Sequence, residues 1–304
     1  MKFALQITFL LAVCLVFAPA SLTSQIDWYK INFTLFEIYY TETDQNLAED
    51  LAIQVEKEYA DLSQQLGLRY TQPVRIFLSP SDQVFHQLTG QMIPHWGAGV
   101  ADPDKSLIFL KSPNYFRHAG KFARVLRHEL VHVLIGQSLA PSQHVPKWFH
   151  EGMAIYFSYD ADFSGGKAIS KALLSNSIIP LDEIDGMLDF HSEKARLAYE
   201  ESYSVILFIE DKLGFRALVE LVQAVRSEPS FDVAIRDHYG QDIYEFEKDW
   251  YNYIENKYRW RFLLDFETFL WIFILLLFIF VFVAIRMRNR KIMRRWDEEE
   301  RWVG

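Results

Sequence analysis

An uncharged apolar segment near the C-terminus constrains the fold of this chain more than any other feature. Residues 268–285 carry no charge and consist almost wholly of Leu, Ile, Phe and Val. As a helix, this segment would rise about 27 Å, which is enough to cross most of a bilayer core. A buried core helix is the alternative, but the segment has no polar face to present to water. We therefore predict one transmembrane helix over residues 266–286.

The residues at the two ends of the chain predict its orientation. Arginines and lysines follow the apolar segment closely, so the positive-inside rule predicts a cytoplasmic basic tail over residues 287–304. Residues 1–20 combine Lys2, an apolar run and a final Ala18-Pro19-Ala20, which is typical of a secretory signal peptide. An uncleaved N-terminal anchor is the alternative. Together these features predict a single-pass cell-membrane protein with an extracytoplasmic domain over residues 21–262.

Charge and cysteine content narrow the possible partners and chemistry. The chain has a net charge of −9, and its last nineteen residues contain seven basic and four acidic side chains, which leaves −12 for the remainder. An acidic ectodomain argues against nucleic acid or an anionic membrane surface as a partner. Cys14 is the only cysteine and lies in the predicted signal peptide, so a mature domain without it would form no disulfide.

A short motif in the middle of the chain predicts a metal site. His128 and His132 are four residues apart in an apolar run, so on a helix they share one face and can bind one ion. Glu129 lies beside them, where a carboxylate can act as a general base toward water. Nineteen residues after His132, Glu151 can supply a third ligand and leave the fourth position open, as in catalytic zinc sites. Two surface histidines on an amphipathic helix are the alternative.

The order of the predicted elements indicates an α+β protein. Strand-like segments occupy the first part of the ectodomain together with a few helices, and the later part is helical. We expect a small mixed N-terminal sheet with helices, followed by a mostly helical zincin-type lobe. The predicted strands cover residues 31–40, 74–78, 97–101 and 107–110, and the predicted helices cover 47–66, 81–87, 118–138, 146–159, 165–175, 192–212, 214–226 and 230–262.

These motifs resemble those of the gluzincin metallopeptidases, in particular the peptidase MA-like domains related to the aminopeptidase N family. The similarity rests on the His-Glu-x-x-His motif, the eighteen residues that follow it, and Trp148-x-x-Glu151-Gly152-x-Ala154-x-Tyr156. It covers about residues 30–260. The resemblance implies that His128, His132 and Glu151 bind Zn²⁺ and that Glu129 is the general base.

Two neighbouring residues compete for these roles. His150 adjoins Glu151, but consecutive helical residues point about 100° apart, so only one of them can face the metal. The family pattern and the Glu-Gly pair favour Glu151. Downstream, the segment Tyr199-Glu200-Glu201-Ser202-Tyr203 resembles the one that carries the family's transition-state tyrosine. The resemblance places that tyrosine at Tyr199, with Tyr203 one helical turn later as the alternative.

One departure from the family bears on specificity. The aminopeptidases carry a glutamate, just before the zinc helix, that holds the free amine of the substrate. The comparable residues 97–101 contain no carboxylate, which puts N-terminal trimming in doubt, although a strand there can still pair with an extended peptide. We expect a membrane-anchored extracytoplasmic zinc metallopeptidase, an endopeptidase, that acts on peptides or proteins. The alternative is a zinc-containing peptide-binding or assembly module without turnover.

Overall fold

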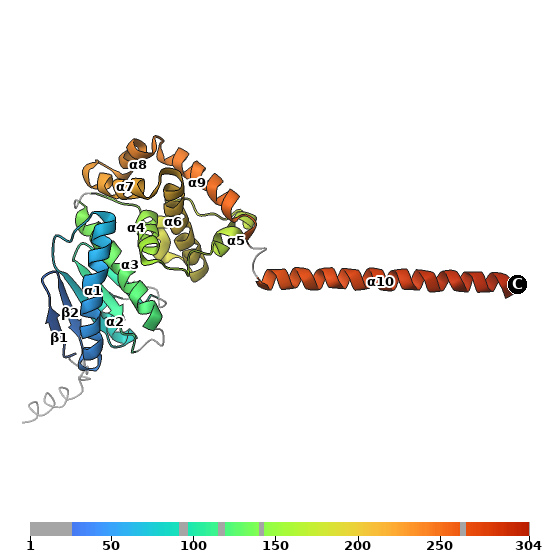
Figure 1. Ribbon diagram of the computed structural model, residues 1–304, viewed down its shortest axis with the longest axis horizontal. Helices are drawn as coiled ribbons and strands as arrows, with labels where there is room; N and C mark the ends of the chain where they lie inside the picture. The colour runs from blue at the N-terminus through green and yellow to red at the C-terminus, as the bar shows by residue number, and fades with distance from the viewer. Residues whose placement is uncertain (1–25, 91–96, 115–118, 140–142, 262–265, 304) are drawn as a thin grey trace, which may run out of the picture.

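The computed structural model describes residues 26–90, 97–114, 119–139, 143–261 and 266–303. The predicted signal peptide, together with His95 and His118, lies outside these residues. In the described part, five strands form one mixed sheet in the order β1-β2-β3-β5-β4, and helices make up the rest (Figure 1). The expected α+β fold with a small mixed N-terminal sheet and a mostly helical second part is thereby confirmed.

The sheet begins with a hairpin where one long strand was expected. Residues 31–40 are divided between β1 (Tyr29–Asn32) and β2 (Phe36–Tyr40), which pair antiparallel. The N–H of Phe33 donates to the carbonyl oxygen of Phe36 and closes the turn at 2.8 Å. The prediction of a single strand was wrong because aromatic and β-branched residues continue through this turn, which contains neither Gly nor Pro.

The remaining three strands complete the sheet and place β4 at its edge. β3 (Val74–Ser79) lies parallel to both β2 and β5 (Leu107–Lys111), and β4 (Gly99–Asp102) pairs antiparallel with β5. Among the described strands, β4 therefore lies at the edge of the sheet, next to β5. The alternating side chains Val74, Ile76 and Leu78 of the central strand are fully buried.

Three helices accompany the sheet. α1 (Gln45–Leu66) ends at Gly67, whose φ of 64° is left-handed, and α2 (Asp82–Thr89) begins at Ser81, whose hydroxyl accepts a hydrogen bond from the N–H of Val84. α3 (Ala119–Ser138) contacts α1, β4 and β5. The long helix α3 thus runs beneath the edge of the sheet and connects it to the helical part.

The helical part is assembled around α6. The helix α6 (Ser192–Leu213) contacts α4 (Lys147–Ser158), α5 (Lys167–Ser175), α7 (Phe215–Ser227) and α9 (Ile243–Tyr258). The predicted helix over 230–262 is in fact two helices, α8 (Phe231–Tyr239) and α9. The chain turns between them because Gly240 is left-handed with a φ of 80° and Asp242 caps the start of α9.

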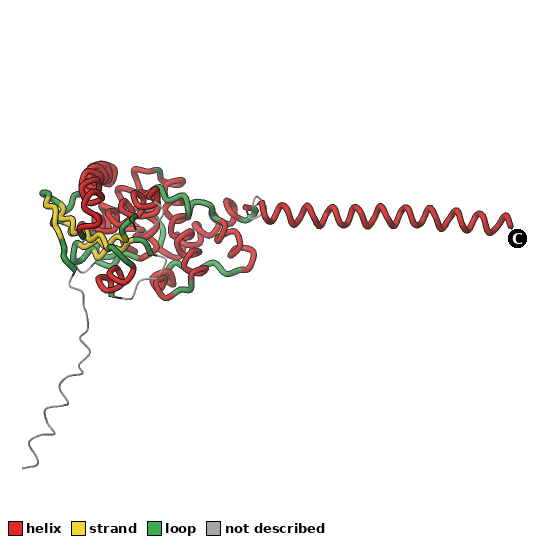
Figure 2. Tube along the Cα trace, turned by 90° about the horizontal axis from the view of Figure 1, so that it is seen from below, coloured by secondary structure: helices red, strands yellow, loops and turns green. Residues whose placement is uncertain are grey.

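The C-terminal helix α10 (Phe266–Val303) projects away from the folded part in both views (Figures 1 and 2). Its segment Phe269–Trp296 has a mean hydropathy of 2.9 and none of its most apolar window is buried, which makes α10 a candidate membrane span. The predicted basic tail continues the same helix. The helix predicted to reach residue 262 stops earlier, because α9 ends at Tyr258.

Candidate metal centre

The two motif histidines lie on α3, and another face of this helix packs into the core. Its apolar side chains Leu126, Leu130 and Leu134 are fully buried in the core. The hydroxyl of Tyr70 also donates a 3.0 Å hydrogen bond to the main-chain oxygen of Leu130. His128 and His132 project from the opposite side of the helix and are half-buried, with their Nε2 atoms 3.1 Å apart.

The helix α4 brings a carboxylate to the same point. The Oε2 atom of Glu151 lies 3.4 Å from His128 Nε2 and 3.6 Å from His132 Nε2. One ligand atom from each of the three residues lies within 4.8 Å of the other two. Two imidazoles and one carboxylate make up a donor set found in catalytic zinc sites.

The electrostatics of Glu151 fit a cation at this point. Burial alone would raise the pKa of Glu151, but His132 and His128 outweigh that effect and lower it, so the carboxylate is charged. Both imidazole Nε2 atoms lie close to Oε2, but among the described residues this buried atom has no partner with hydrogen-bond geometry. Buried charges normally bind a partner or a metal, and a zinc ion held by all three residues would satisfy Oε2.

Glu129 faces the edge of the sheet. Its carboxylate is buried and accepts a hydrogen bond from the main-chain N–H of Ala101 in β4. Burial raises the pKa of Glu129 to about 7, with Glu151 reinforcing the shift and His132 opposing it. A carboxylate that titrates near neutrality is suited to accept and return a proton.

Two glycines allow α3 to approach the edge strand closely. A Cβ atom at Gly99 in β4 would lie 2.6 Å from Val125 Cγ1 and 3.0 Å from Glu129 Cγ. Further along α3, a Cβ atom at Gly136 would overlap the ring of Pro103, which follows β4. The glycine positions therefore keep the edge of the sheet directly above the motif helix.

Tyr199 approaches this cluster from α6, and Tyr203 does not. Burial raises the pKa of Tyr199 well above its usual value, with further contributions from the nearby charges of Glu151 and Glu129. The pKa of Tyr203 is raised by burial and by Glu210, and its ring neighbours that of Tyr156. Of the two tyrosines considered from the sequence, Tyr199 is the one whose pKa the charges of Glu151 and Glu129 raise.

His150 lies next to the cluster but outside it. Its ring centroid is 6.0 Å from that of His132, and burial, reinforced by His132, lowers its pKa to about 4. It lines a pocket of about 530 Å³ whose wall also includes His144 and Gln137. Two other described histidines have structural contacts: His144 pairs with Asp185 at 3.1 Å, and His191 caps α6.

One residue of the motif region was not singled out from the sequence. The buried guanidinium of Arg127, directly before His128, pairs with Glu58 and Asp61 of α1 and donates to the main-chain oxygen of Phe157 in α4. This arginine joins three helices on the side of α3 away from the histidines. No spacing in the sequence connects Arg127 to residues almost seventy positions earlier.

The family model of the Peptidase MA superfamily matches residues 55–256. A structure of yeast LTA4 hydrolase in complex with bestatin is similar at 13% sequence identity with a TM-score of 0.42. That similarity covers 80% of this chain and 39% of the hydrolase, so the chain spans well under half of that protein. Among the curated proteins, none matches this chain.

Proposed function

The chain belongs to the Peptidase MA superfamily, and from this membership we propose that it is a membrane-anchored zinc metallopeptidase. The prediction of a peptidase MA-like domain is confirmed by the family match over residues 55–256. The proposed zinc domain covers residues 21–262, between a signal peptide over 1–20 and a transmembrane helix over 266–286. The residues 287–304 form the cytoplasmic tail of this proposal.

The observation that carries the proposal is the convergence of His128, His132 and Glu151, with the buried Oε2 atom of Glu151 lacking a hydrogen-bond partner. These three residues would hold the zinc ion. Bound there, zinc supplies a Lewis acid that acidifies water and polarises a carbonyl group. Packing alone does not account for this half-buried cluster, because it gathers a charged carboxylate and two imidazoles around one point where a cation can bind all three.

Two further residues would act on the substrate directly. Glu129 would accept the proton of the attacking water and pass it to the leaving amine, and the N–H of Ala101 holds its carboxylate in place. The hydroxyl of Tyr199 would donate a hydrogen bond to the oxygen of the scissile carbonyl as negative charge develops on it. Burial keeps this phenol protonated at all ordinary pH values, as a donor must be.

The edge strand β4 favours an extended peptide as substrate. Its outer edge lies beside Glu129, whose carboxylate accepts a hydrogen bond from the N–H of Ala101, and such an edge can pair with an added strand through main-chain hydrogen bonds. Residues 97–101 offer no carboxylate for a free amine, which favours internal cleavage over N-terminal trimming. We therefore propose an extracytoplasmic endopeptidase, with a zinc-containing peptide-binding or assembly module without turnover as the alternative.

A quenched-fluorescence peptide library distinguishes the two functions. The full chain in detergent should cleave peptides, lose activity with a chelator and recover it with zinc. Glu129→Gln should retain zinc but lose activity by at least about 10²-fold, because an amide cannot accept the proton, whereas the exposed control Glu193→Gln should be unaffected. Equal cleavage by wild type and Glu129→Gln would contradict the mechanism. Zinc binding without any cleavage would favour the binding module.

A further inference from the structure

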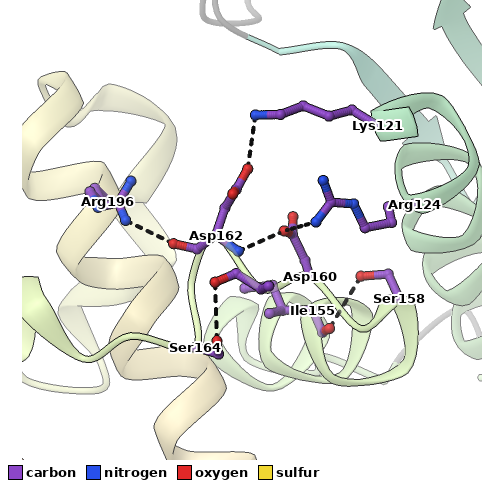
Figure 3. A network of polar contacts seen from close by, with 9 residues as sticks. Lys121, Arg124, Ile155, Ser158, Asp160, Asp162, Ser164 and Arg196 are labelled. Carbon is purple, nitrogen blue, oxygen red and sulfur yellow. Dashed lines mark hydrogen bonds and ion pairs between the residues drawn. The ribbon is translucent and has the colours of Figure 1, made fainter. Parts of the chain in front are cut away.

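The loop that joins α4 to α5, residues 159–166, lies between α3 and α6 and contacts both (Figure 3). We name it the bridging loop. It contacts α3, which carries the two motif histidines, and α6, which carries Tyr199. These contacts are not required by the covalent connection between α4 and α5, since a loop of this length could follow the surface without touching either helix.

On the side of α3, two acidic residues of the bridging loop pair with two basic residues. Lys121 Nζ lies 2.9 Å from Asp162 Oδ2, and Arg124 Nη1 lies 3.6 Å from Asp160 Oδ1. Arg124 precedes His128 by four residues, so it lies one helical turn away on the same face. The bridging loop is therefore attached to α3 immediately beside the proposed metal ligands.

On the side of α6, the bridging loop reaches the neighbourhood of Tyr199. Arg196 Nη2 donates a 2.7 Å hydrogen bond to the main-chain oxygen of Asp162, and Arg196 precedes Tyr199 by three residues. The ring of Phe163 lies 5.1 Å from the ring of Tyr199 and is tilted by 39°. The guanidinium of Arg196 lies 5.8 Å from the centre of the Phe163 ring. Phe163 is thus held between Arg196 and the proposed catalytic tyrosine.

Hydrogen bonds within the bridging loop fix the relation between its two attachments. The N–H of Asp162 donates to Asp160 Oδ1 at 3.0 Å, and the hydroxyl of Ser164 donates to the main-chain oxygen of Ala161 at 3.0 Å. Asp162 therefore contacts α3 through its carboxylate and α6 through its main chain (Figure 3). Asp162 thus links α3 to α6.

Because these ion pairs are exposed, we expect them to affect the position of the bridging loop more than the free energy of unfolding. The side chains of Lys121 and Asp162 are 58% and 48% exposed, and such pairs contribute only about 0–1 kcal/mol. Catalytic rates, in contrast, respond to displacements of about 1 Å. We propose that the bridging loop positions the hydroxyl of Tyr199 over the metal site, with Asp162 and Phe163 as positioning residues. This inference rests on the proposed peptidase function of Tyr199.

Kinetics of the full chain test the inference. Asp162→Asn should lower kcat by up to about fivefold and Phe163→Ala by about tenfold or more, with zinc content and KM unchanged. Exchanging the charges in a Lys121→Asp, Asp162→Lys double variant should restore part of the kcat lost in Asp162→Lys alone. The control Glu220→Gln removes an exposed ion pair of 2.8 Å with Arg216 and should have no effect. A fall in zinc content that accounts for the lost activity would overturn the inference.

Combination with Tyr199→Phe provides the decisive comparison. If the loop acts through the Tyr199 hydroxyl, Asp162→Asn should lower kcat no further in the Tyr199→Phe background. Multiplication of the two effects would overturn the inference. The ¹⁹F resonance of 3-fluorotyrosine placed at position 199 provides a measurement that does not depend on peptide cleavage. It should shift or broaden in Asp162→Asn and in Phe163→Ala but not in Glu220→Gln, and an unchanged resonance would overturn the inference even in a chain that cleaves nothing.

Discussion

Gly152 of α4 lies directly against the main-chain carbonyl oxygen of Ser202 in α6. A Cβ atom at Gly152 would overlap that oxygen and lie 2.7 Å from Ile206 Cγ1. The two helices therefore approach at this point as closely as their backbones allow. Glu151 is the neighbour of Gly152, and Tyr199 lies three residues before Ser202, so this contact determines the distance between the proposed ligand and the proposed oxyanion donor.

We predict that Gly152→Ala destabilises the protein and lowers its activity. The added methyl group meets rigid backbone, so the helices must separate, and overpacking of this kind costs about 1–3 kcal/mol. Denaturant-induced unfolding of the detergent-solubilised chain measures the change. Gly165→Ala is the matched control, because a Cβ atom there has no neighbour within 4 Å. Equal stability of the two variants would show that α4 and α6 can separate without loss.

The metal site predicts one zinc ion per chain. Replacement of His128, His132 or Glu151 by alanine should remove at least one ligand and lower the zinc content measured by atomic absorption. His144→Ala is the control, since this exposed histidine pairs with Asp185 and should leave zinc bound. Full zinc retention in a His128→Ala, His132→Ala double variant would refute the assignment.

The two tyrosines of α6 should respond differently to removal of their hydroxyl groups. Tyr199→Phe should lower kcat by about 10²-fold, as loss of one oxyanion donor does, with little change in zinc content. Tyr203→Phe should leave kcat unchanged, because Tyr203 lies beside Tyr156 and Glu210 instead of the metal cluster. The reverse ranking in steady-state kinetics would transfer the proposed role to Tyr203.

Local sequence patterns predicted most elements of this fold, and the exceptions have physical causes. The helix α1 ends where Gly67 takes a left-handed conformation, and α2 begins at its Ser81 cap, both as expected from residue type. The β1–β2 turn and the break at Gly240 were missed. In the hairpin, strand-forming residues run through the turn, and in the long helix, apolar spacing continues on both sides of one glycine.

The candidate site also has residues that local sequence patterns predicted and residues that they did not. Helical spacing brings His128 and His132 together, and a glutamate at the start of the next helix was expected to join them. The support for these residues comes from distant segments. Ala101 of the edge strand holds Glu129, and Arg127 joins α3 to α1. Such contacts follow from tertiary packing, which leaves no periodic signal in the sequence.

A buried carboxyl group predicts a dependence of stability on pH. Glu201 accepts a 3.1 Å hydrogen bond from the N–H of Ile179, and its Oε2 atom is buried without a partner. Burial raises the pKa of Glu201 well above 4.5, so the folded state holds its proton more tightly than the unfolded state. The free energy of unfolding should therefore be highest below about pH 4.5 for this group and fall as pH rises toward the folded pKa, by at most about 1.4 kcal/mol per pH unit.

Glu201→Gln should abolish this contribution, because glutamine retains the carbonyl acceptor for Ile179 and carries no titratable proton. Unfolding by denaturant at several pH values measures the slope for wild type and variant. The exposed Glu193→Gln should keep the slope of wild type. A slope in Glu201→Gln as steep as that of wild type would assign the pH dependence to other groups.

The last prediction concerns topology, on which access to substrate depends. The exposed apolar surface of α10 makes it a candidate membrane span, and the basic residues after it favour the cytoplasm. Arg261 donates a 3.0 Å hydrogen bond to the main-chain oxygen of Gly165, and the apolar segment begins only eight residues later, at Phe269. The catalytic domain should therefore work close to the membrane, on substrates at its outer surface. Added protease should digest this domain in spheroplasts and leave an epitope on the tail protected. A protected domain with an accessible tail would refute both the orientation and the extracytoplasmic function.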